Sequence, residues 1–532
     1  MNDQGLGSWP RRRARMSPDR AALVEQGRTT TYAEVEQRSA ALAHGLRSRG
    51  VRRGDRVAYL GPNSTAFVVT LFATARLGAV FVPLNTRLAP PELAYILADA
   101  APALLVRADA CAQQADSPDV AALGRPQLLA DGTGPGTLAE LERAAAAVVE
   151  ADDVDETVGL DDLFMIQYTS GTSGRPKGVR LTHGNVTWNV VNLLVDLDVR
   201  SDEVALVTAP MFHTAALNQV LLPTFLKGGR SLLEARWDPA RAVALIESEQ
   251  VTLLFGVTTM FQALFAEPSW AGADLRSLRS AISGGAPLPE SLLRAALERG
   301  FMIQQGYGLT EASPGVTFLR GDDNVRKVGS AGTACFFSDV RIVDTELEDV
   351  AGGVPGEVLT QGPNVTTGYW QRPDATAETI LPGGWLRTGD IARRDEDGYL
   401  YIVDRLKDMI ISGGENIFPA EVENAIHTHP GVAECVVIGV PDERWGEVGC
   451  AVVVPRDGRA LTGAELVAHL EGRLARYKIP RSVVVVEAGL PRTGSGKIIR
   501  AAVRSRYGGA EPTTPARTPP VPVGVPEQGD TP

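Results

Sequence analysis

The sequence predicts an α/β fold, with a large N-terminal domain of parallel-sheet αβ layers, a small β subdomain within it, and a small α+β domain at the C-terminal end. Two observations predict this class. Short apolar runs, which are typical of buried strands, alternate with longer amphipathic stretches over about the first 400 residues. The chain of 532 residues is also longer than one hydrophobic core usually supports, so we expect two or more domains.

The elements of the large domain follow from this alternation. One helix, expected over residues 291–299, has Pro289 near its start and Gly300 as a C-terminal stop. Strands that alternate with helices pair mostly in parallel, so largely parallel sheets are expected. The turn-rich segment 352–358 changes the pattern to short strands, which indicates the β subdomain. The expected buried strands are residues 57–60, 104–106, 163–168, 204–208, 253–255 and 281–283.

The pattern changes again after Asp404. The expected helices cover residues 420–427 and 465–477, and the expected strands cover residues 435–440, 451–454 and 482–487. Together they make a compact unit of about a hundred residues, which is an ordinary size for a small domain. The end of the chain is rich in Pro and Thr without apolar periodicity, which predicts disorder. The predicted domains are residues 1–404 and 405–510, followed by a disordered tail of residues 511–532.

Composition restricts the class of partner and the location. A net charge of −12 argues against a nucleic acid or an anionic membrane as the main partner. No segment approaches the roughly 18 apolar residues that span a bilayer. The four cysteines lack metal-ligand spacing and are expected to be buried. These features predict a soluble cytoplasmic protein and leave its oligomeric state open.

A loop rich in Gly, Ser and Thr follows the expected strand 163–168. Its glycines allow close approach to an anion, its hydroxyls can donate hydrogen bonds, and Lys177 adds positive charge, so we expect a polyphosphate ligand. It is not a Walker A loop, because Lys177 is followed by Gly178 and preceded by Pro176, nor does it have the glycine spacing of a dinucleotide fingerprint. The predicted phosphate-binding residues are Thr169, Ser170, Gly171, Thr172, Ser173, Gly174 and Lys177.

This loop resembles the signature of the adenylate-forming superfamily, which contains acyl- and aryl-CoA synthetases, peptide-synthetase adenylation domains and firefly-type luciferases. Further motifs follow in the family's order, and the resemblance extends to about Tyr507. The branch that looks most similar is that of bacterial fatty-acyl and coumarate-type CoA ligases. The resemblance implies ATP, Mg²⁺ and coenzyme A as co-substrate, a small-molecule acid as substrate, and a mobile C-terminal domain.

The resemblance also implies roles for single residues. In the motif of residues 306–311, Tyr307 would stack on adenine, Thr310 would bond the α-phosphate, and Glu311 would coordinate Mg²⁺, which prefers oxygen ligands. Asp390 would bind both ribose hydroxyls, for which an ionised carboxylate offers only acceptors. The segment that passes along the adenine and the acyl group would be Gly284, Gly285, Ala286 and Pro287.

The C-terminal motifs complete the implied site. Arg405 would contact ribose or phosphate, and Lys407 would be the hinge of the small domain. Lys497, on a Gly/Ser loop, would bridge the substrate carboxylate and the α-phosphate. His213 would gate the acyl pocket or accompany thioester formation, although a core histidine without a chemical role fits nearly as well. The expected substrate pocket consists of His213, Val257, Gly284, Gly306 and Gly308.

The predicted activity is therefore that of an ATP-dependent ligase, which forms an acyl-adenylate and then a CoA thioester from a fatty or aryl acid. Three alternatives stay open. The adenylate could pass to a carrier protein, although His213 stands where amino-acid-selective domains usually carry Asp. The enzyme could instead use an amine acceptor or activate an inorganic acid such as nitrite. A non-enzymatic AMP sensor is disfavoured by the intact set of Lys177, Glu311, Asp390, Arg405 and Lys497.

Overall fold

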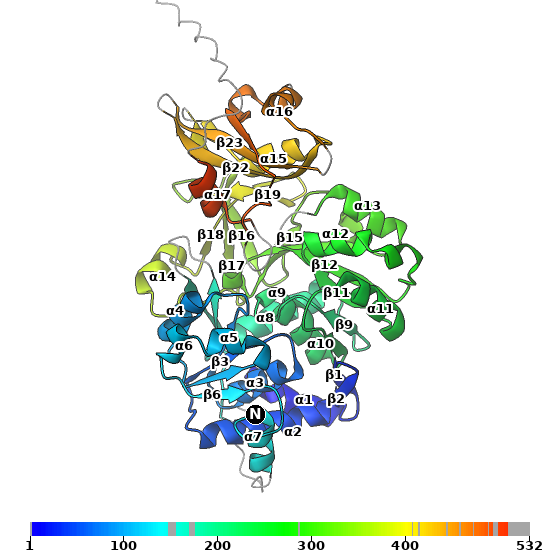
Figure 1. Ribbon diagram of the computed structural model, residues 1–532, viewed down its shortest axis with the longest axis vertical. Helices are drawn as coiled ribbons and strands as arrows, with labels where there is room; N and C mark the ends of the chain where they lie inside the picture. The colour runs from blue at the N-terminus through cyan, green and yellow to red at the C-terminus, as the bar shows by residue number, and fades with distance from the viewer. Residues whose placement is uncertain are drawn as a thin grey trace, which may run out of the picture. The chain divides into compact units, whose positions relative to one another are not determined.

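The protein is described here from a computed structural model (Figure 1). It describes residues 3–146, 156–169, 176–285, 288–406, 408–412, 415–442, 445–456, 459–471, 473–487, 489–492 and 498–508. The chain divides into two compact units, the first made of Met1–Thr388 and Ala392–Ile402 and the second of Gly389–Ile391 and Val403–Pro532. The predicted boundary between residues 404 and 405 stays a prediction, and the predicted tail lies outside the described residues.

The larger sheet of the first unit has the order β15-β14-β13-β12-β11-β9-β10-β1-β2. From β1 to β13 every neighbouring pair is parallel, whereas β2, β14 and β15 join antiparallel at the two edges. The α/β class is therefore confirmed. The strands are β1 (Ala21–Glu25), β2 (Arg28–Thr31), β9 (Val204–Val207), β10 (Arg230–Leu233), β11 (Leu253–Gly256), β12 (Ser280–Gly284), β13 (Ile303–Gly308), β14 (Gly315–Leu319) and β15 (Thr333–Ala334).

A second sheet has the order β6-β5-β3-β4-β7-β8. It is parallel except for its last pair, β7 and β8, which form an antiparallel hairpin. The glycine-rich segment lies between these two strands in the sequence, and the register of the hairpin fixes the residues on either side of it. The strands are β3 (Arg56–Leu60), β4 (Val80–Leu84), β5 (Leu104–Arg107), β6 (Gln127–Leu129), β7 (Leu163–Thr169) and β8 (Lys177–Thr182).

Helices cover these sheets, and Figure 1 shows α11, α12 and α13 beside β11 and β12. Capping boxes start two of them, at Thr31 with Glu34 and at Thr182 with Asn185. The helix predicted over residues 291–299 is observed as α13. The helices are α1 (Trp9–Met16), α2 (Tyr32–Ser48), α3 (Thr65–Arg76), α4 (Pro90–Ala100), α5 (Ala112–Ala115), α6 (Pro118–Ala121), α7 (Leu138–Ala146), α8 (His183–Asp196), α9 (Thr214–Ala216), α10 (Leu222–Lys227), α11 (Pro239–Glu249), α12 (Thr258–Ala266), α13 (Glu290–Glu298) and α14 (Pro373–Thr379).

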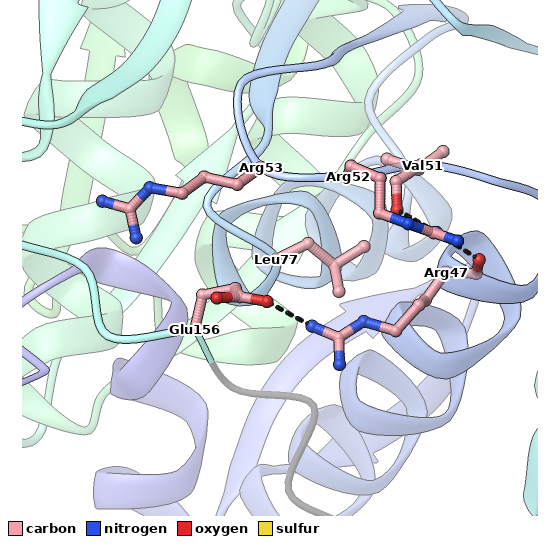
Figure 2. A pocket seen from close by; sticks show the side chains of 6 residues that line it. All are labelled: Arg47, Val51, Arg52, Arg53, Leu77 and Glu156. Carbon is pink, nitrogen blue, oxygen red and sulfur yellow. Dashed lines mark hydrogen bonds and ion pairs between the residues drawn. The ribbon is translucent and has the colours of Figure 1, made fainter.

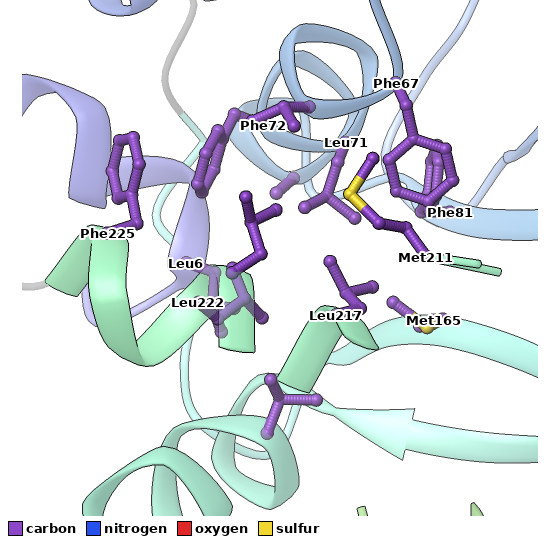
Figure 3. Close-up of a cluster of buried hydrophobic side chains, with 14 of the residues drawn as sticks. Leu6, Phe67, Leu71, Phe72, Phe81, Met165, Met211, Leu217, Leu222 and Phe225 are labelled. Carbon is purple, nitrogen blue, oxygen red and sulfur yellow. The ribbon is translucent and has the colours of Figure 1, made fainter. Parts of the chain in front are cut away.

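The largest apolar core joins the two sheets around α3. In Figure 3, Phe67, Leu71 and Phe72 of this helix lie with Met165 of β7 and with Met211, and all five side chains are buried. Burial of each such side chain contributes about 1.5–3 kcal/mol. Because Met211 is fully enclosed two residues before a predicted site histidine, this core also holds the start of the loop that follows β9.

The turn-rich segment and the second unit also have the predicted character. Strands β16 (Asp339–Val343), β17 (Gly356–Gln361), β18 (Leu386–Arg394) and β19 (Leu400–Arg405) form a four-stranded sheet. The second unit contains α15 (Pro419–His427), α16 (Gly463–Leu470) and α17 (Arg500–Tyr507). Its sheet consists of β20 (Ile410–Ser412), β21 (Glu415–Ile417), β22 (Val432–Asp442), β23 (Gly446–Pro455) and β24 (Ser482–Val485).

One predicted helix of the second unit is shorter than expected. The sequence predicts a helix over residues 465–477, whereas α16 ends at Leu470 and a separate turn covers Arg476–Lys478. The difference has a local reason, because Gly472 interrupts the expected helix and glycine costs about 1 kcal/mol in a helix interior.

The structure also bears on the cysteines and on membrane spans. Cys111, Cys335, Cys435 and Cys450 are all free and buried, as predicted. Over the described ranges, no helix combines the length and the apolar character that crossing a membrane requires.

A buried histidine anchors the N-terminal segment and makes stability depend on pH. The Nδ1 atom of His183 accepts a hydrogen bond of 3.1 Å from the backbone N–H of Leu6, and both residues are fully buried. Burial lowers the pKa of His183 to about 3. The unfolded state, with a pKa near 6.5, therefore binds a proton that the folded state excludes. The contribution of His183 to the free energy of unfolding is fully present above about pH 6.5, and it is lost as the pH falls toward the pKa of the folded state.

We expect His183→Gln to be less stable than the wild type at pH 7.5, with a stability difference that shrinks at pH 5.5. The difference should fall by up to about 1.4 kcal/mol per pH unit below 6.5, because only the wild type loses the histidine contribution. Urea unfolding of both proteins at the two pH values measures it. A difference that stays constant with pH would contradict this account.

Candidate active site

Predicted site residues follow the carboxyl ends of four neighbouring strands. Strands β9, β11, β12 and β13 are adjacent and parallel, so their carboxyl ends meet at one edge of the sheet. His213 follows β9, Val257 follows β11, Gly285 follows β12, and Glu311 follows β13. Open parallel sheets usually bind their ligands at this edge. The fold therefore brings together residues that lie about a hundred positions apart in the sequence.

The glycines at this edge differ in what surrounds them. A Cβ atom at Gly308 would lie 1.7 Å from the carbonyl oxygen of Pro314, and one at Gly306 would lie 3.1 Å from the ring of Phe318. A side chain at Gly308 would therefore clash with backbone, whereas one at Gly306 would require the Phe318 ring to shift slightly. Gly284 has only ordinary contacts, whereas Gly285 has a φ of +86° and open space where a side chain would stand. At Gly285 a side chain would therefore stand in open space, whereas the predicted contact of the other three glycines with the acid stays a prediction.

Buried asparagines hold the turn that carries Thr310 and Glu311. The Nδ2 atom of Asn364 donates to the carbonyl oxygens of Ala312 (2.9 Å) and Gly315 (2.7 Å). The Nδ2 atom of Asn218 donates to the carbonyl oxygen of Ser313 over 3.1 Å. Buried side-chain amides that bind backbone groups make a turn rigid, because leaving such groups unpaired is costly. The turn after β13 is therefore pre-organised by residues from two separate segments.

His213 lies in a loop that is also held by side-chain amides. Gln167 donates from Nε2 to the carbonyl oxygen of Phe212 over 2.5 Å, and Asn63 accepts from the Met211 N–H over 2.8 Å. The Nε2 atom of His213 is enclosed and has no hydrogen-bond partner among the residues that the structure describes. Burial, and then the charge of Arg87, lower the pKa of His213 to about 4. The imidazole is therefore neutral near pH 7.

The phosphate hairpin is described at its base. Thr169, the last residue of β7, pairs with Lys177, the first residue of β8. Gly178 allows the hairpin to pack tightly, because a Cβ atom there would lie 2.6 Å from Cγ2 of Ile166. The remaining residues predicted to bind phosphate lie outside the described residues, namely Ser170, Gly171, Thr172, Ser173 and Gly174.

One tyrosine connects the hairpin to the turn after β13. The Nζ atom of Lys177 lies 5.1 Å from the centre of the Tyr369 ring, and the Tyr369 hydroxyl donates to Oε1 of Glu311 over 2.9 Å. Burial, and then the Glu311 carboxylate, raise the pKa of the Tyr369 hydroxyl, so it stays protonated and remains a donor. Tyr369 is not among the residues that the motifs predict. Its only signal in the sequence is a Gly-Tyr-Trp run, which also occurs where tyrosines merely pack.

Glu311 offers a carboxylate suited to Mg²⁺. Within the described ranges, no group of three or more His, Cys, Asp or Glu residues is arranged to hold a metal. A single carboxylate beside a phosphate loop fits Mg²⁺ nonetheless, because this ion commonly takes one or two carboxylates from the protein and phosphate oxygens from its nucleotide.

The other predicted residues have separate positions. Tyr307 is half-buried and packs against the apolar cluster of the four-stranded sheet. Asp390, in β18, is only 5% exposed. Ala286, Pro287, Lys407 and Lys497 lie outside the described residues, as does the side chain of Arg405. The roles that the resemblance implies for all of them stay predictions.

A surface pocket of about 240 Å³ offers arginines but not the chemistry of this site (Figure 2). Arg47 pairs with Glu156 at 2.5 Å, and Arg53 pairs with Asp162 at 2.7 Å. Arg52 and Arg53 precede β3, so the pocket lies at the amino ends of these parallel strands. Ligands of such sheets bind at the opposite, carboxyl ends. This pocket is therefore not part of the candidate active site.

Two family models match the chain. A model described as AMP-binding enzyme matches residues 10–370, and one described as AMP-binding enzyme C-terminal domain matches residues 421–497. The chain is 54% identical over 508 residues to a feruloyl-CoA synthase of an Amycolatopsis species, which covers 96% of this chain and 100% of that one. It is 41% identical over 502 residues to an indoleacetate–CoA ligase of Aromatoleum aromaticum, and this match covers 94% of this chain and 97% of that one.

The fold is likewise similar to a solved structure of this kind. The o-succinylbenzoate CoA synthetase of Bacillus subtilis in complex with its acyl-adenylate intermediate has a TM-score of 0.84 at 32% identity, covering 95% of this chain and 99% of that one. The same enzyme in complex with ATP and magnesium ion has a TM-score of 0.83 at 32% identity, covering 93% and 99%.

Proposed function

The chain belongs to the AMP-binding enzyme family, and we propose that it joins an aryl acid of the hydroxycinnamic class to coenzyme A by way of an acyl-adenylate. ATP-dependent acid–CoA ligation is the activity of its relatives. The 54% identity to a feruloyl-CoA synthase along the whole length of that protein carries the choice of acid. The arrangement of Lys177, Tyr369 and Glu311 beside the strand ends supports the adenylation step.

In the first step, a carboxylate oxygen of the acid attacks the α-phosphorus of ATP. A bond forms between that oxygen and phosphorus, and the bond to the bridging oxygen breaks, so that pyrophosphate leaves with the electron pair. Lys177 and the glycine-rich loop would hold the phosphates, and Thr310 would bond the α-phosphate. Mg²⁺ held by Glu311 would supply charge neutralisation on the phosphates. The protein contributes mainly alignment and fixed charges, because this chemistry needs little covalent help.

In the second step, the thiol sulfur of coenzyme A attacks the carbonyl carbon of the adenylate. The thioester bond forms, the bond to AMP breaks, AMP leaves with the electron pair, and the thiol proton is released to solvent. The neutral His213 beside the predicted acyl pocket is suited to accept a hydrogen bond during this step. Rotation of the second unit about Lys407 between the steps is part of the proposal, as is a cytoplasmic location.

A panel of acids tests the choice of substrate. With coenzyme A present, we expect pyrophosphate release to be at least about tenfold faster with ferulic and coumaric acids than with long-chain fatty acids. A pocket shaped for one acid loses about 1–3 kcal/mol of transition-state binding with a poorly fitting one. Benzoic and indoleacetic acids are the matched controls, since they are aryl acids that lack the propenoate chain.

The acceptor is tested with the same acids. Thioester formation that needs coenzyme A, and does not occur with a phosphopantetheinylated carrier protein or an amine, supports the proposal. Faster turnover of fatty acids would contradict the choice of a hydroxycinnamic acid as substrate, but it would be consistent with the proposed CoA-ligase activity. Pyrophosphate release with none of the acids would reject the ligase itself.

A further inference from the structure

The segment of residues 366–370 is hydrogen-bonded to two motifs at once. One is predicted to bind phosphate, and the other is predicted to bind Mg²⁺. On one side, the backbone N–H of Trp370 donates to the carbonyl oxygen of Gly178 over 2.7 Å, and that of Arg180 donates to the carbonyl oxygen of Gly368 over 3.0 Å. On the other side, the N–H of Thr366 donates to the carbonyl oxygen of Glu311 over 2.7 Å. The segment therefore spans the base of the phosphate hairpin and the turn after β13.

The side chain of Tyr369 makes the same connection with its two chemically different parts. Its ring lies 5.1 Å from the Lys177 ammonium, and its hydroxyl donates to the Glu311 carboxylate over 2.9 Å. The electron-rich face of an aromatic ring attracts a cation, and a hydroxyl that donates to a carboxylate orients one of its oxygens. Tyr369 is half-buried, and its backbone is bridged to Val179, which fixes the point from which its side chain extends.

We propose that Tyr369 is a positioning residue that presets both charges of the nucleotide site, namely the Lys177 ammonium for phosphate and the Glu311 carboxylate for Mg²⁺. The proposal rests on the proposed adenylation function. The ring and the hydroxyl have separate tasks. The ring keeps the ammonium over the site, and the hydroxyl fixes the carboxylate in one rotamer, so that neither charge has to reorganise when MgATP binds.

A direct measure is the affinity for ATP with and without Mg²⁺, in the absence of any acid. For the wild type, we expect Mg²⁺ to tighten equilibrium binding of ATP, measured by calorimetry. In Tyr369→Phe the ring remains but the hydroxyl is lost, so the tightening by Mg²⁺ should shrink by about tenfold, the size expected for a hydrogen bond to a charged group. Binding of ATP in EDTA should change little. Tyr369→Leu should in addition weaken ATP binding in EDTA, since the contact to Lys177 is lost.

The chain offers a matched control. Tyr399 has the same arrangement elsewhere in the first unit, with Nζ of Lys327 lying 4.8 Å from its ring centre and its hydroxyl donating to Asp323. Tyr399→Phe should therefore leave the effect of Mg²⁺ on ATP binding unchanged. A thermal unfolding scan of each variant shows whether the fold is retained.

A double-mutant cycle with Glu311→Gln locates the effect. This substitution keeps an oxygen that can accept from Tyr369 and removes the charge, so Tyr369→Phe should cost nothing further in Mg²⁺ response when added to it. An unchanged Mg²⁺ response in Tyr369→Phe, an equal loss in Tyr399→Phe, or additive losses in the cycle would overturn the proposal. A wild type that binds no ATP and releases no pyrophosphate would overturn the proposed function and this inference together.

Discussion

Replacement of Lys497 by alanine should abolish acid-dependent ATP–pyrophosphate exchange and largely spare thioester formation from supplied acyl-adenylate. The expected loss in the first step is at least about a hundredfold, the size seen when one donor to a developing negative charge is removed. The described backbone around this lysine suits such a role. Arg492 and Ile498, which flank the motif that contains Lys497, form an antiparallel bridge, so the two ends of this motif are held together.

Two assays on one preparation measure this effect. Exchange of labelled pyrophosphate into ATP reports adenylation, and thioester formation from synthetic feruloyl-adenylate and coenzyme A reports the second step. Arg504→Ala is the control, because Arg504 is an exposed cation on the helix that follows the loop. Normal exchange in Lys497→Ala would remove this lysine from the mechanism. An equal loss in both assays would indicate a role in folding or in both steps.

Replacement of Gly308 by alanine should have the second largest effect. The added Cβ atom would lie 1.7 Å from the carbonyl oxygen of Pro314, so either the strand or the turn must move. That turn carries Thr310 and Glu311 and is held by Asn218 and Asn364, so a shift there breaks buried hydrogen bonds as well. We expect a loss of stability of about 3 kcal/mol or more and an adenylation rate at least about a hundredfold lower.

Thermal unfolding and pyrophosphate exchange measure the two effects of Gly308→Ala. Gly352→Ala is the control, because no atom lies within 4 Å of the position that its Cβ would take. If Gly308→Ala is produced only as aggregate, the soluble fraction and its unfolding midpoint against that control still report the clash. A variant with wild-type stability and exchange would show that the turn accommodates the methyl group.

Much of the fold was predictable from local patterns. The buried strands at residues 57–60, 253–255 and 281–283 were predicted within one or two residues of β3, β11 and β12, because short apolar runs between turn residues leave few alternatives. The helix predicted to reach residue 477 was too long, since apolar spacing in the sequence continues beyond Leu470, where α16 ends. Pairing order between strands carries no comparable local signal.

The candidate site was predictable as motifs but not as a geometry. The loop before Lys177 and the turn at Glu311 stand out by composition, and the match to AMP-binding enzymes confirms the family that they indicate. The contact of Tyr369 with Glu311 was not predicted, because a single aromatic residue between turn residues has no distinguishing sequence pattern. Gly306 and Gly308 were expected to line the pocket for the acid. A Cβ atom added at these positions would instead meet Phe318 and Pro314. Whether they border the acid stays a prediction.

The sequence by itself therefore determined the α/β class, the family and the kind of reaction, because these depend on periodicity and on short motifs whose residues act as neighbours. Only the tertiary structure decided which distant residues meet. The parallel order β9-β11-β12-β13 brings four loops to one edge, and the pairing of Tyr369 with Val179 places a tyrosine between Lys177 and Glu311. Such contacts arise from packing over more than a hundred residues, and local composition does not encode them.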